Sequence, residues 1–395
     1  MKILPVSIPE DIDKYFFNRK KDIAMINTQL STIKLDIPPL LLITGSKGIG
    51  KTFLIKKIFK DLSEDILTAY VDLSRFQTSL KGKVTEEEVL KAILSQIITS
   101  LSRDEKFYRK WIGKITSNIE KLGLKNYDFS NSANIFDLPL PVISDNYDKL
   151  SKFVMELPQK IVDASDEIKG FIIAIDEFQL LKNVENPEAF FWLIRSFTQK
   201  QFNVGYIFTG SVSKTSEVIN MINGYEGAFG GRLIQINIEP FTFDETKRYI
   251  DEKSNNLKFT DEGFKQFYKC TRGIPLYINS LSSILPNNMI CDENIIRETL
   301  QLNIDQVAIM WVYVWGRLSR SEKDFIIYLL ENEDTSRKSL DENLGYSKSS
   351  ISRFIDSLSN QGIIEFTLDR NFVLSDKMLE FWLKIKFENN GFYPL

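Results

Sequence analysis

Apolar runs that alternate with helical patterns mark residues 38–240 as one structural unit. Five short runs rich in apolar residues predict strands at residues 40–43, 68–73, 171–175, 204–209 and 233–238. Between them, apolar residues recur at helical spacing over residues 53–58, 86–101, 147–162 and 187–198. Strands that alternate with helices in this way indicate a parallel sheet that helices cover on both faces. The pattern therefore predicts an α/β core with a parallel sheet.

After Pro240 the strand pattern stops and helices dominate. A small helical domain is expected first, with helices at residues 244–253, 261–269 and 277–285. Three further helices and two short strands follow at residues 322–331, 340–344, 348–360, 363–367 and 371–374, an order typical of a winged helix-turn-helix. The apolar run 307–315 predicts a helix buried between these two parts. We expect a core at 1–240, a helical lid at 241–304 and a winged domain at 305–395, with an insertion in the core at about 102–145.

The amino-acid composition excludes several kinds of catalytic and metal site. The chain has 395 residues, of which 43% are apolar, and no histidine. Imidazole bases, Ser-His-Asp systems and His-ligated metal sites are therefore excluded. The two cysteines, Cys270 and Cys291, lack CxxC spacing, and we expect buried free thiols.

Neither a membrane nor a secretory route is expected. The longest apolar run has nine residues, about half the length of a spanning helix. At the start of the chain, Pro5 and acidic residues come too early for a signal peptide, so we expect a cytoplasmic protein. The net charge of −3 gives no global attraction to nucleic acid, and any such contact must be local.

A glycine-rich segment lies between the first predicted strand and the helix after it. Residues 45–52 fit the pattern GxxxxGK[ST], as Gly45, Ser46, Lys47, Gly48, Ile49, Gly50, Lys51 and Thr52. Glycines let successive backbone N–H groups turn towards phosphate oxygens, and the helix N-terminus adds partial positive charge. We expect Lys51 to reach the β- and γ-phosphates of ATP and Thr52 to hold Mg²⁺.

Two acids, Asp176 and Glu177, come directly after the run 171–175. Asp176 is expected to hold Mg²⁺ through a water molecule and so to complete the magnesium site with Thr52. Since the chain has no histidine, Glu177 is the leading candidate for the base that activates water. The alternative interpretation is that both acids simply follow a core strand into solvent; the glycine-rich loop upstream favours the site over this alternative.

Two hydroxyls, Thr209 and Ser211, end the fourth predicted strand at the edge where parallel sheets bind ligands. Either one could sense the γ-phosphate or the attacking water. A cap for the next helix is an equally good interpretation.

Six segments in a fixed order carry a family resemblance. They are Phe17-Asn18-Arg19 with Lys20-Lys21-Asp22, the loop GSKGIGKT, the strand end FIIAIDE, the segment FTGS, the segment GGR before LIQINIEPF, and Arg272-Gly273-Ile274-Pro275-Leu276-Tyr277. In these segments the chain resembles the archaeal ATPase family, a branch of P-loop ATPases close to AAA+ proteins and to the signal-transduction ATPases with numerous domains (STAND). The resemblance implies a P-loop sheet of the AAA+/STAND type, a helical lid and a winged helix.

The resemblance also implies roles for residues outside the loop. Phe17, Asn18 and Arg19 would lie near the adenine, and Gly273 to Pro275 would place the lid over the nucleotide. Arg232 resembles an arginine that stabilises γ-phosphate charge in its own or a neighbouring subunit of a homo-oligomer. The alternative interpretation is a surface arginine at the start of a strand. The case for Arg272 as a lid arginine is weaker. The insertion at about 102–145 does not resemble any segment of this family.

Three functions remain open at this stage. The first is an ATP-dependent molecular switch, the second a DNA-associated ATPase, and the third an ADP-holding scaffold for protein contacts with little turnover. Lys348 and Arg353, in the predicted recognition helix, suit duplex DNA. Residues 305–395, however, hold 11 Lys+Arg and 14 Asp+Glu, which suits a protein partner equally well. The insertion residues Lys106, Arg109, Lys110 and Trp111 offer another contact surface or an amphipathic packing face.

Overall fold

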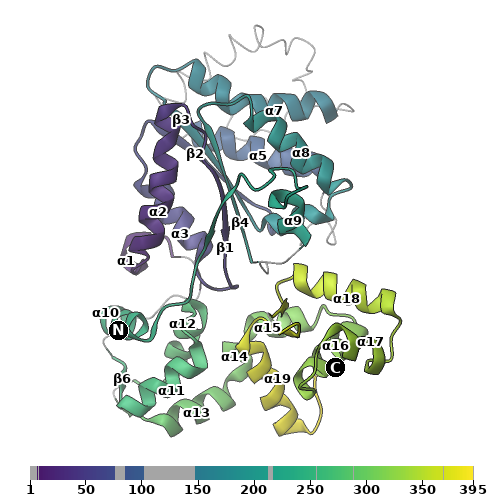
Figure 1. The fold of residues 1–395 in the computed structure, drawn as a ribbon. Helices are drawn as coiled ribbons and strands as arrows, with labels where there is room; N and C mark the ends of the chain where they lie inside the picture. Colours follow the sequence, from purple (N-terminus) through teal and green to yellow (C-terminus); the bar gives the residue numbers. More distant parts are fainter. Residues whose placement is uncertain are drawn as a thin grey trace, which may run out of the picture.

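A five-stranded parallel sheet forms the centre of the larger part of the molecule (Figure 1). The computed structural model describes residues 7, 9–75, 85–101, 147–211, 217–254, 256–287, 289–367 and 369–394. The strands are β1 (Leu40–Thr44), β2 (Ile66–Asp72), β3 (Gly170–Asp176), β4 (Val204–Gly210) and β5 (Ile234–Asn237). Their order in the sheet is β2-β3-β4-β1-β5. The predicted parallel sheet is confirmed, and β4 separates the two strands that carry the predicted site.

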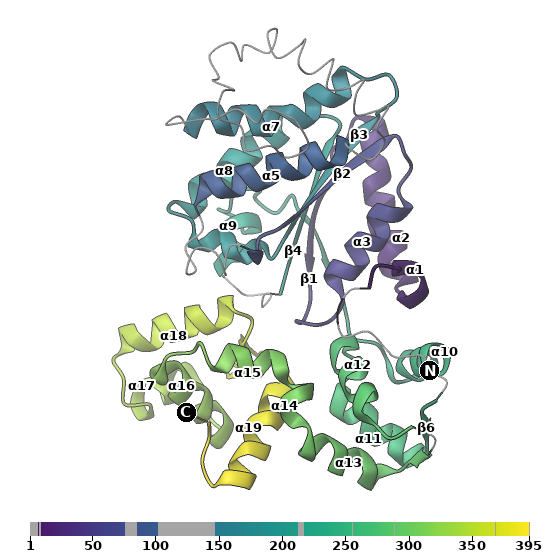
Figure 2. The ribbon, with the colours of Figure 1, turned by 180° about the vertical axis from the view of Figure 1, so that it is seen from behind.

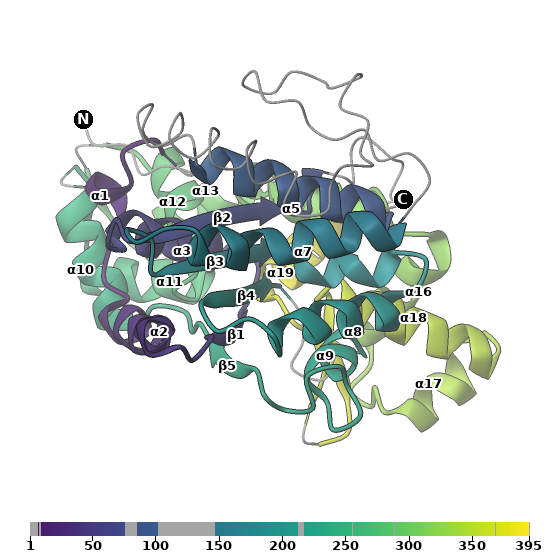
Figure 3. The same cartoon turned by 90° about the horizontal axis from the view of Figure 1, so that it is seen from above.

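Helices cover both faces of this sheet (Figures 1 and 3). One face carries α2 (Lys20–Ser31) and α3 (Lys51–Asp61); the other carries α5 (Glu86–Leu101), α7 (Tyr147–Asp163), α8 (Pro187–Thr198) and α9 (Glu217–Asn223). Alternate strand residues divide between two buried clusters: Leu41 and Ile43 pack with α2 and α3, whereas Leu42 packs on the opposite side. This alternation explains why the three central strands, β1, β3 and β4, are almost wholly apolar.

Local capping explains why two helices begin where the sequence predicts. Thr85 and Glu88 form a reciprocal pair at the start of α5, with Glu88 N donating to Thr85 Oγ1 at 3.2 Å and Thr85 N donating to Glu88 Oε2 at 3.1 Å. Asn186 accepts from Ala189 N at 3.2 Å at the start of α8, whose first residue is Pro187.

The chain leaves the sheet at β5 and enters a helical region below it (Figure 2). Its helices are α10 (Phe243–Lys253), α11 (Asp261–Thr271), α12 (Pro275–Ile284) and α13 (Glu293–Leu302). Three of these were predicted, and α13 was not. A two-residue parallel pair, β6 (Lys258–Phe259) with β7 (Ile290–Cys291), also lies here, so strands do not end at Pro240 as the sequence suggested. Such short strands leave no periodicity to detect.

The C-terminal part, residues 305–395, lies beside this region and under the sheet (Figures 1 and 2). The first of its helices, α14 (Ile304–Val307), lies across its start. The elements that follow are α15 (Ile309–Trp315), α16 (Arg320–Glu331), α17 (Arg337–Asn343), α18 (Lys348–Asn360), the antiparallel strands β8 (Ile364–Phe366) and β9 (Phe372–Leu374), and α19 (Lys377–Asn390). The three helices and the hairpin occur where they were predicted. Helix α18 also contacts α9 of the sheet region.

One buried cluster runs through all these regions. It extends from α2, α3 and the sheet through α11 and α12 to Trp311, Trp315 and the C-terminal helices. Cys270 and Cys291 belong to it as buried free thiols, as predicted. None of the helices in the described part of the chain has the length and apolar character needed to cross a membrane.

Candidate nucleotide-binding and hydrolysis site

The glycine-rich loop lies between β1 and α3, at the carboxyl edge of the sheet. Gly48 and Gly50 have left-handed backbones, with φ of 79° and 97°, which favour glycine. At Gly48 the loop also meets α12 closely: a Cβ there would lie 2.7 Å from Leu276 Cβ. The backbone N–H of Leu276 donates to Gly48 O at 3.2 Å. The loop is therefore fitted directly to the first turn of α12.

Lys51 extends across the loop. Its Nζ donates to Gly45 O at 2.9 Å, to Ser46 O at 3.1 Å and to Ser211 Oγ at 2.6 Å. Burial lowers the pKa of Lys51 to about 8, while the carboxylates of Glu177 and Asp176 oppose that shift. Ser211 is thus joined to the loop, which favours the site interpretation over a helix cap.

The carboxylate of Asp176 accepts hydrogen bonds from side chains of two neighbouring strands, β2 and β4, and of helix α3. Thr52 Oγ1 donates to its Oδ2 at 2.6 Å, and the hydroxyls of Tyr70 and Thr209 also donate to this carboxylate. Register explains the convergence, because Asp176 pairs with Asp72 on one side and with Thr209 on the other. Burial raises the pKa of Tyr70, and the charge of Asp176 raises it further, so the phenol remains a donor. Sequence reasoning missed Tyr70, whose only signal was its place near the end of the neighbouring strand.

Glu177 follows Asp176 with a left-handed backbone, φ 55°. Its side chain faces the cavity described below, and its carboxylate accepts a hydrogen bond from Gln179 Nε2. Burial raises the pKa of Glu177, and Asp176 adds to the rise. A carboxylate with raised pKa is a stronger proton acceptor than an ordinary one.

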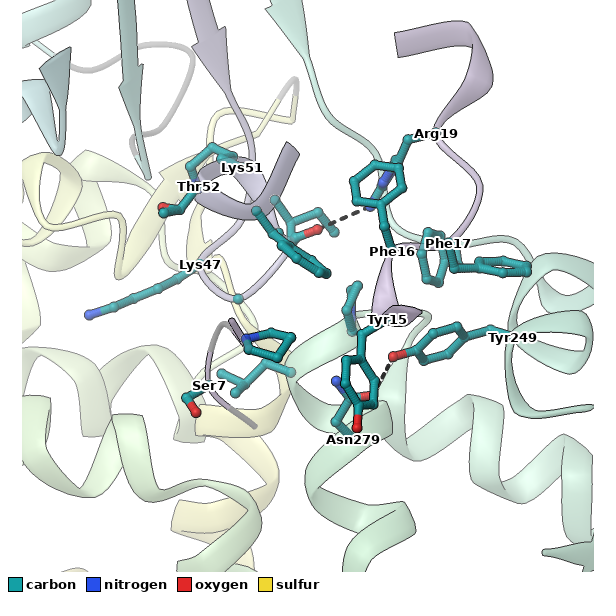
Figure 4. A pocket seen from close by; sticks show the side chains of 18 of the residues that line it. Ser7, Tyr15, Phe16, Phe17, Arg19, Lys47, Lys51, Thr52, Tyr249 and Asn279 are labelled. Atoms are coloured by element: carbon teal, nitrogen blue, oxygen red, sulfur yellow. Dashed lines mark hydrogen bonds between the residues drawn. The ribbon is translucent and has the colours of Figure 1, made fainter. Parts of the chain in front are cut away.

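A cavity of about 240 Å³ lies between the loop, the N-terminal segment and α12 (Figure 4). Its wall is polar at the loop and aromatic at the far end, where Phe17 packs edge-on against Phe241 and tilted against Tyr249. The residues that line it are Ser7, Pro9, Tyr15, Phe16, Phe17, Arg19, Lys47, Gly48, Ile49, Gly50, Lys51, Thr52, Phe53, Glu177, Ser211, Phe241, Tyr249, Pro275, Leu276 and Asn279. Most of the predicted binding residues therefore surround one cavity.

The neighbouring side chains of Arg19 and Asn18 point in different directions, and only Arg19 lines the cavity. Arg19 donates through Nη2 to Ile49 O at 3.1 Å, and its guanidinium lies 4.6 Å from the centre of the Phe241 ring. Asn18 instead donates from Nδ2 to Glu245 Oε1 at 2.6 Å and is not among the lining residues. Two consecutive left-handed residues turn the chain here and send the two side chains apart.

Four predicted residues from the later part of the chain, Arg232, Arg272, Lys348 and Arg353, do not line the cavity. Arg232 is exposed just before β5, at the amino end of that strand, whereas the loop lies at the carboxyl end. Arg272 is exposed and ends α11 with φ 52°. Lys348 and Arg353 are exposed on α18. Lys106, Arg109, Lys110 and Trp111 lie outside the described residues.

Comparisons with known proteins agree with this site. A family model described as an ATPase domain predominantly from Archaea matches residues 16–281. No curated protein sequence matches the chain significantly. Among solved structures, the Walker-type ATPase PABY2304 of Pyrococcus abyssi has 17% identity and a TM-score of 0.64, with 94% of this chain and 97% of that chain covered. That likeness shows the same fold.

Two weaker structural matches are the ORC1 protein of Aeropyrum pernix in complex with DNA and a RuvB protein of Thermotoga maritima. The first has 13% identity and a TM-score of 0.49, covering 97% of this chain and 96% of that one. The second has 14% identity and a TM-score of 0.45, covering 94% and 97%. The family match itself extends over well more than half of the 395 residues. On that basis the chain belongs to the archaeal ATPase family and is a nucleotide-binding P-loop ATPase.

Proposed function

We propose that the chain is an ATP-dependent switch, in which hydrolysis changes how the C-terminal part is held against the core. The observation that carries this proposal is the double contact made by the first turn of α12. Leu276 N donates to Gly48 O in the phosphate loop, and the next residue, Tyr277, donates from its hydroxyl to Asp376 in the C-terminal part at 2.6 Å. A shift of α12 on nucleotide binding would therefore act directly on the C-terminal part.

We expect ATP to lie with its phosphates at the glycine-rich loop and its adenine at the aromatic end of the cavity. Lys51 binds the β- and γ-phosphate oxygens, and Ser211, already joined to Lys51, contacts the γ-phosphate end. Phe17 and Arg19 take the adenine at the aromatic end, while Pro275 closes the α12 side. Asn18 contributes by fixing the turn rather than by contact with the base.

Mg²⁺ suits the donors at the end of β3. The hydroxyl of Thr52 and the carboxylate of Asp176 are hard oxygen ligands 2.6 Å apart. The ion, when bound, neutralises charge on the phosphate oxygens. Glu177 accepts a proton from the attacking water, since it is buried beside the loop and has a raised pKa.

For the chain as a whole we propose the domain division 1–240, 241–304 and 305–395, with a winged helix formed by α16 to α18 and the hairpin β8–β9. The exposed Lys348 and Arg353 on α18 suit duplex phosphates. Because α18 also contacts α9, which follows Ser211 closely in the chain, the γ-phosphate can influence how α18 is presented. The net negative charge of residues 305–395 makes a protein surface the alternative partner.

Turnover by point variants tests the catalytic assignment. Lys51→Ala should lose ATP affinity or turnover, and Glu177→Gln should bind ATP with Mg²⁺ but hydrolyse it at least roughly 100-fold more slowly. Lys60→Ala is the matched control, since Lys60 lies on the same helix but pairs with the exposed Asp13. Wild-type turnover by Glu177→Gln would remove Glu177 from the mechanism.

Duplex binding by fluorescence anisotropy separates the two partner classes. The full chain is titrated with duplex DNA at several salt concentrations, with ADP and with a non-hydrolysable ATP analogue. If α18 contacts phosphates, affinity falls steeply with salt, and Lys348→Ala or Arg353→Ala each reduces that slope by about one unit. Absence of salt-sensitive binding in both nucleotide states would leave the protein partner.

A further inference from the structure

The side chain of Gln179 is hydrogen-bonded to the proposed base, Glu177. It lies in the short 3₁₀ helix η2 (Phe178–Asn183), which begins directly after Glu177. The left-handed backbone of Glu177 turns the chain so that the two side chains meet, and Gln179 Nε2 donates to Glu177 Oε2. The neighbouring carboxylate thus determines which end of the Gln179 amide faces it.

The opposite end of that amide is left without a partner. Among the described residues, Gln179 Oε1 is buried and accepts no hydrogen bond. It lies against Gly210, where an added Cβ would be 2.3 Å from it. Buried acceptors are nearly always paired, so an unpaired one needs a reason. Rotation of the amide would not provide a better arrangement, because it would place Oε1 against the carboxylate of Glu177.

The place of Gly210 connects this amide to the phosphate end of the site. Gly210 separates Thr209, which donates to Asp176, from Ser211, which accepts from Lys51. Gln179 therefore packs on the backbone that carries both of these contacts. If Gln179 served only to stabilise the short helix η2, it would need neither the hydrogen bond to Glu177 nor its position against Gly210.

We propose that Gln179 is a positioning residue for ATP hydrolysis, which holds one carboxylate oxygen of Glu177 so that the other faces the attacking water. The inference rests on the proposed function of Glu177 as the base. In the step itself, the water proton passes to Glu177, the water oxygen bonds to the γ-phosphorus, and the bond from that phosphorus to the β–γ bridging oxygen breaks to release ADP. Gln179 keeps its protons throughout and acts only by fixing the geometry.

The test compares kcat with nucleotide affinity in two backgrounds. Gln179→Ala in the wild-type chain should lower kcat by roughly 10-fold to 100-fold and leave ATP and ADP affinities within about twofold, since Gln179 acts on Glu177 and not on the nucleotide. The same change in a Glu177→Gln chain should lower the residual kcat no further. A purely structural role would lower kcat by the same factor in both backgrounds, and that result would overturn the inference.

Two further variants guard against a folding defect. Gln179→Glu keeps the size of the side chain but offers a carboxylate to Glu177, so it should lower the kcat of the folded protein at least as much as Gln179→Ala. Gln201→Ala is the control, because Gln201 is a buried glutamine whose bonds to Met155 O and Tyr206 lie outside the site. It should lower the melting temperature and leave the kcat of the folded protein unchanged.

These experiments distinguish a failure of the role proposed for Gln179 from a failure of the role proposed for Glu177. Wild-type turnover by Glu177→Gln would overturn the role of Glu177 and the inference with it. Slow turnover by Glu177→Gln together with wild-type kcat for Gln179→Ala and Gln179→Glu would overturn the inference alone.

Discussion

The hydroxyl of Tyr277 donates a hydrogen bond of 2.6 Å to Asp376 Oδ2, across 99 residues of sequence. Trp311 Nε1 donates in turn to the Tyr277 hydroxyl at 2.7 Å, and Met378 N donates to Asp376 Oδ1 at 2.7 Å. Burial raises the pKa of Asp376, and the bond from Tyr277 opposes that rise. This carboxylate is therefore held by a helix that also contacts the phosphate loop.

Tyr277→Phe should destabilise the protein more at neutral pH than in acid. A carboxyl whose folded pKa lies above its unfolded value contributes stability that is present below the unfolded pKa and is lost as pH rises through the folded pKa. Removal of the donor raises the folded pKa further, so the variant loses more once Asp376 ionises. We expect a loss of about 1 kcal/mol at pH 4.5 and about 2–3 kcal/mol at pH 7.5, measured by urea unfolding.

Tyr249→Phe is the control for this pH dependence. The Tyr249 hydroxyl is also buried, but it donates to the neutral side chain of Asn279 at 2.9 Å. Its loss should be the same at both pH values. Equal losses at pH 4.5 and 7.5 for Tyr277→Phe would contradict a bond to an ionisable partner.

Gly48→Ala should weaken ATP binding more than Gly50→Ala does. Both residues have positive φ, so each substitution adds about 1–2 kcal/mol of backbone strain. Only at Gly48 does the new Cβ meet a neighbour, Leu276 Cβ at 2.7 Å, whereas nothing lies within 4 Å of a Cβ at Gly50. Titration with a fluorescent ATP analogue measures the difference. Equal affinities for the two variants would mean that α12 can move away from the new Cβ without any effect on ATP binding.

Tyr70→Phe should raise the Mg²⁺ concentration needed for half-maximal turnover by roughly 10-fold, as the loss of a residue that orients a metal ligand does. The reason is the hydrogen bond from the Tyr70 hydroxyl to Asp176. Turnover at saturating Mg²⁺ should remain close to that of the wild type. Tyr206→Phe, which loses a bond to Gln201 elsewhere in the sheet, should leave the Mg²⁺ dependence unchanged; the same result for Tyr70→Phe would rule out its orienting role.

Arg232→Ala tests whether a second subunit completes the site. Arg232 lies beyond the amino end of β5, and a strand advances about 3.3 Å per residue, so its own phosphate loop is distant. We expect a lower kcat with unchanged ADP affinity. Mixing Arg232→Ala with inactive Lys51→Ala chains should restore turnover, because each supplies what the other lacks. Absence of both effects would make Arg232 a surface residue.

Local pattern predicted most of the core and the phosphate site. The loop at 45–52 and the two acids after the run 171–175 are encoded within a few residues of chain, and they lie where the pattern predicts, at the ends of β1 and β3. Helix α19 was missed although its buried Met378, Leu379, Trp382 and Leu383 recur at helical spacing.

The missed contacts depend on packing over long separations. Tyr70 reaches Asp176 because two strands pair in register, and Tyr277 reaches Asp376 because α12 packs against the C-terminal part. Neither partner can be read from the residues beside it. Asn18 was expected near the adenine, but a left-handed turn directs it to Glu245, a detail set by backbone geometry.

The buried cluster that joins α12 to the C-terminal helices gives the molecule its own optical reporter. Trp311, Trp315 and Trp382 are 2%, 2% and 3% exposed, whereas Trp192 is 49% exposed and already in contact with water. Separation of the C-terminal part from α12 would carry indole rings from an apolar interior into solvent. Their emission would shift to the red, so any such separation can be followed by the native fluorescence of the protein, without an attached dye.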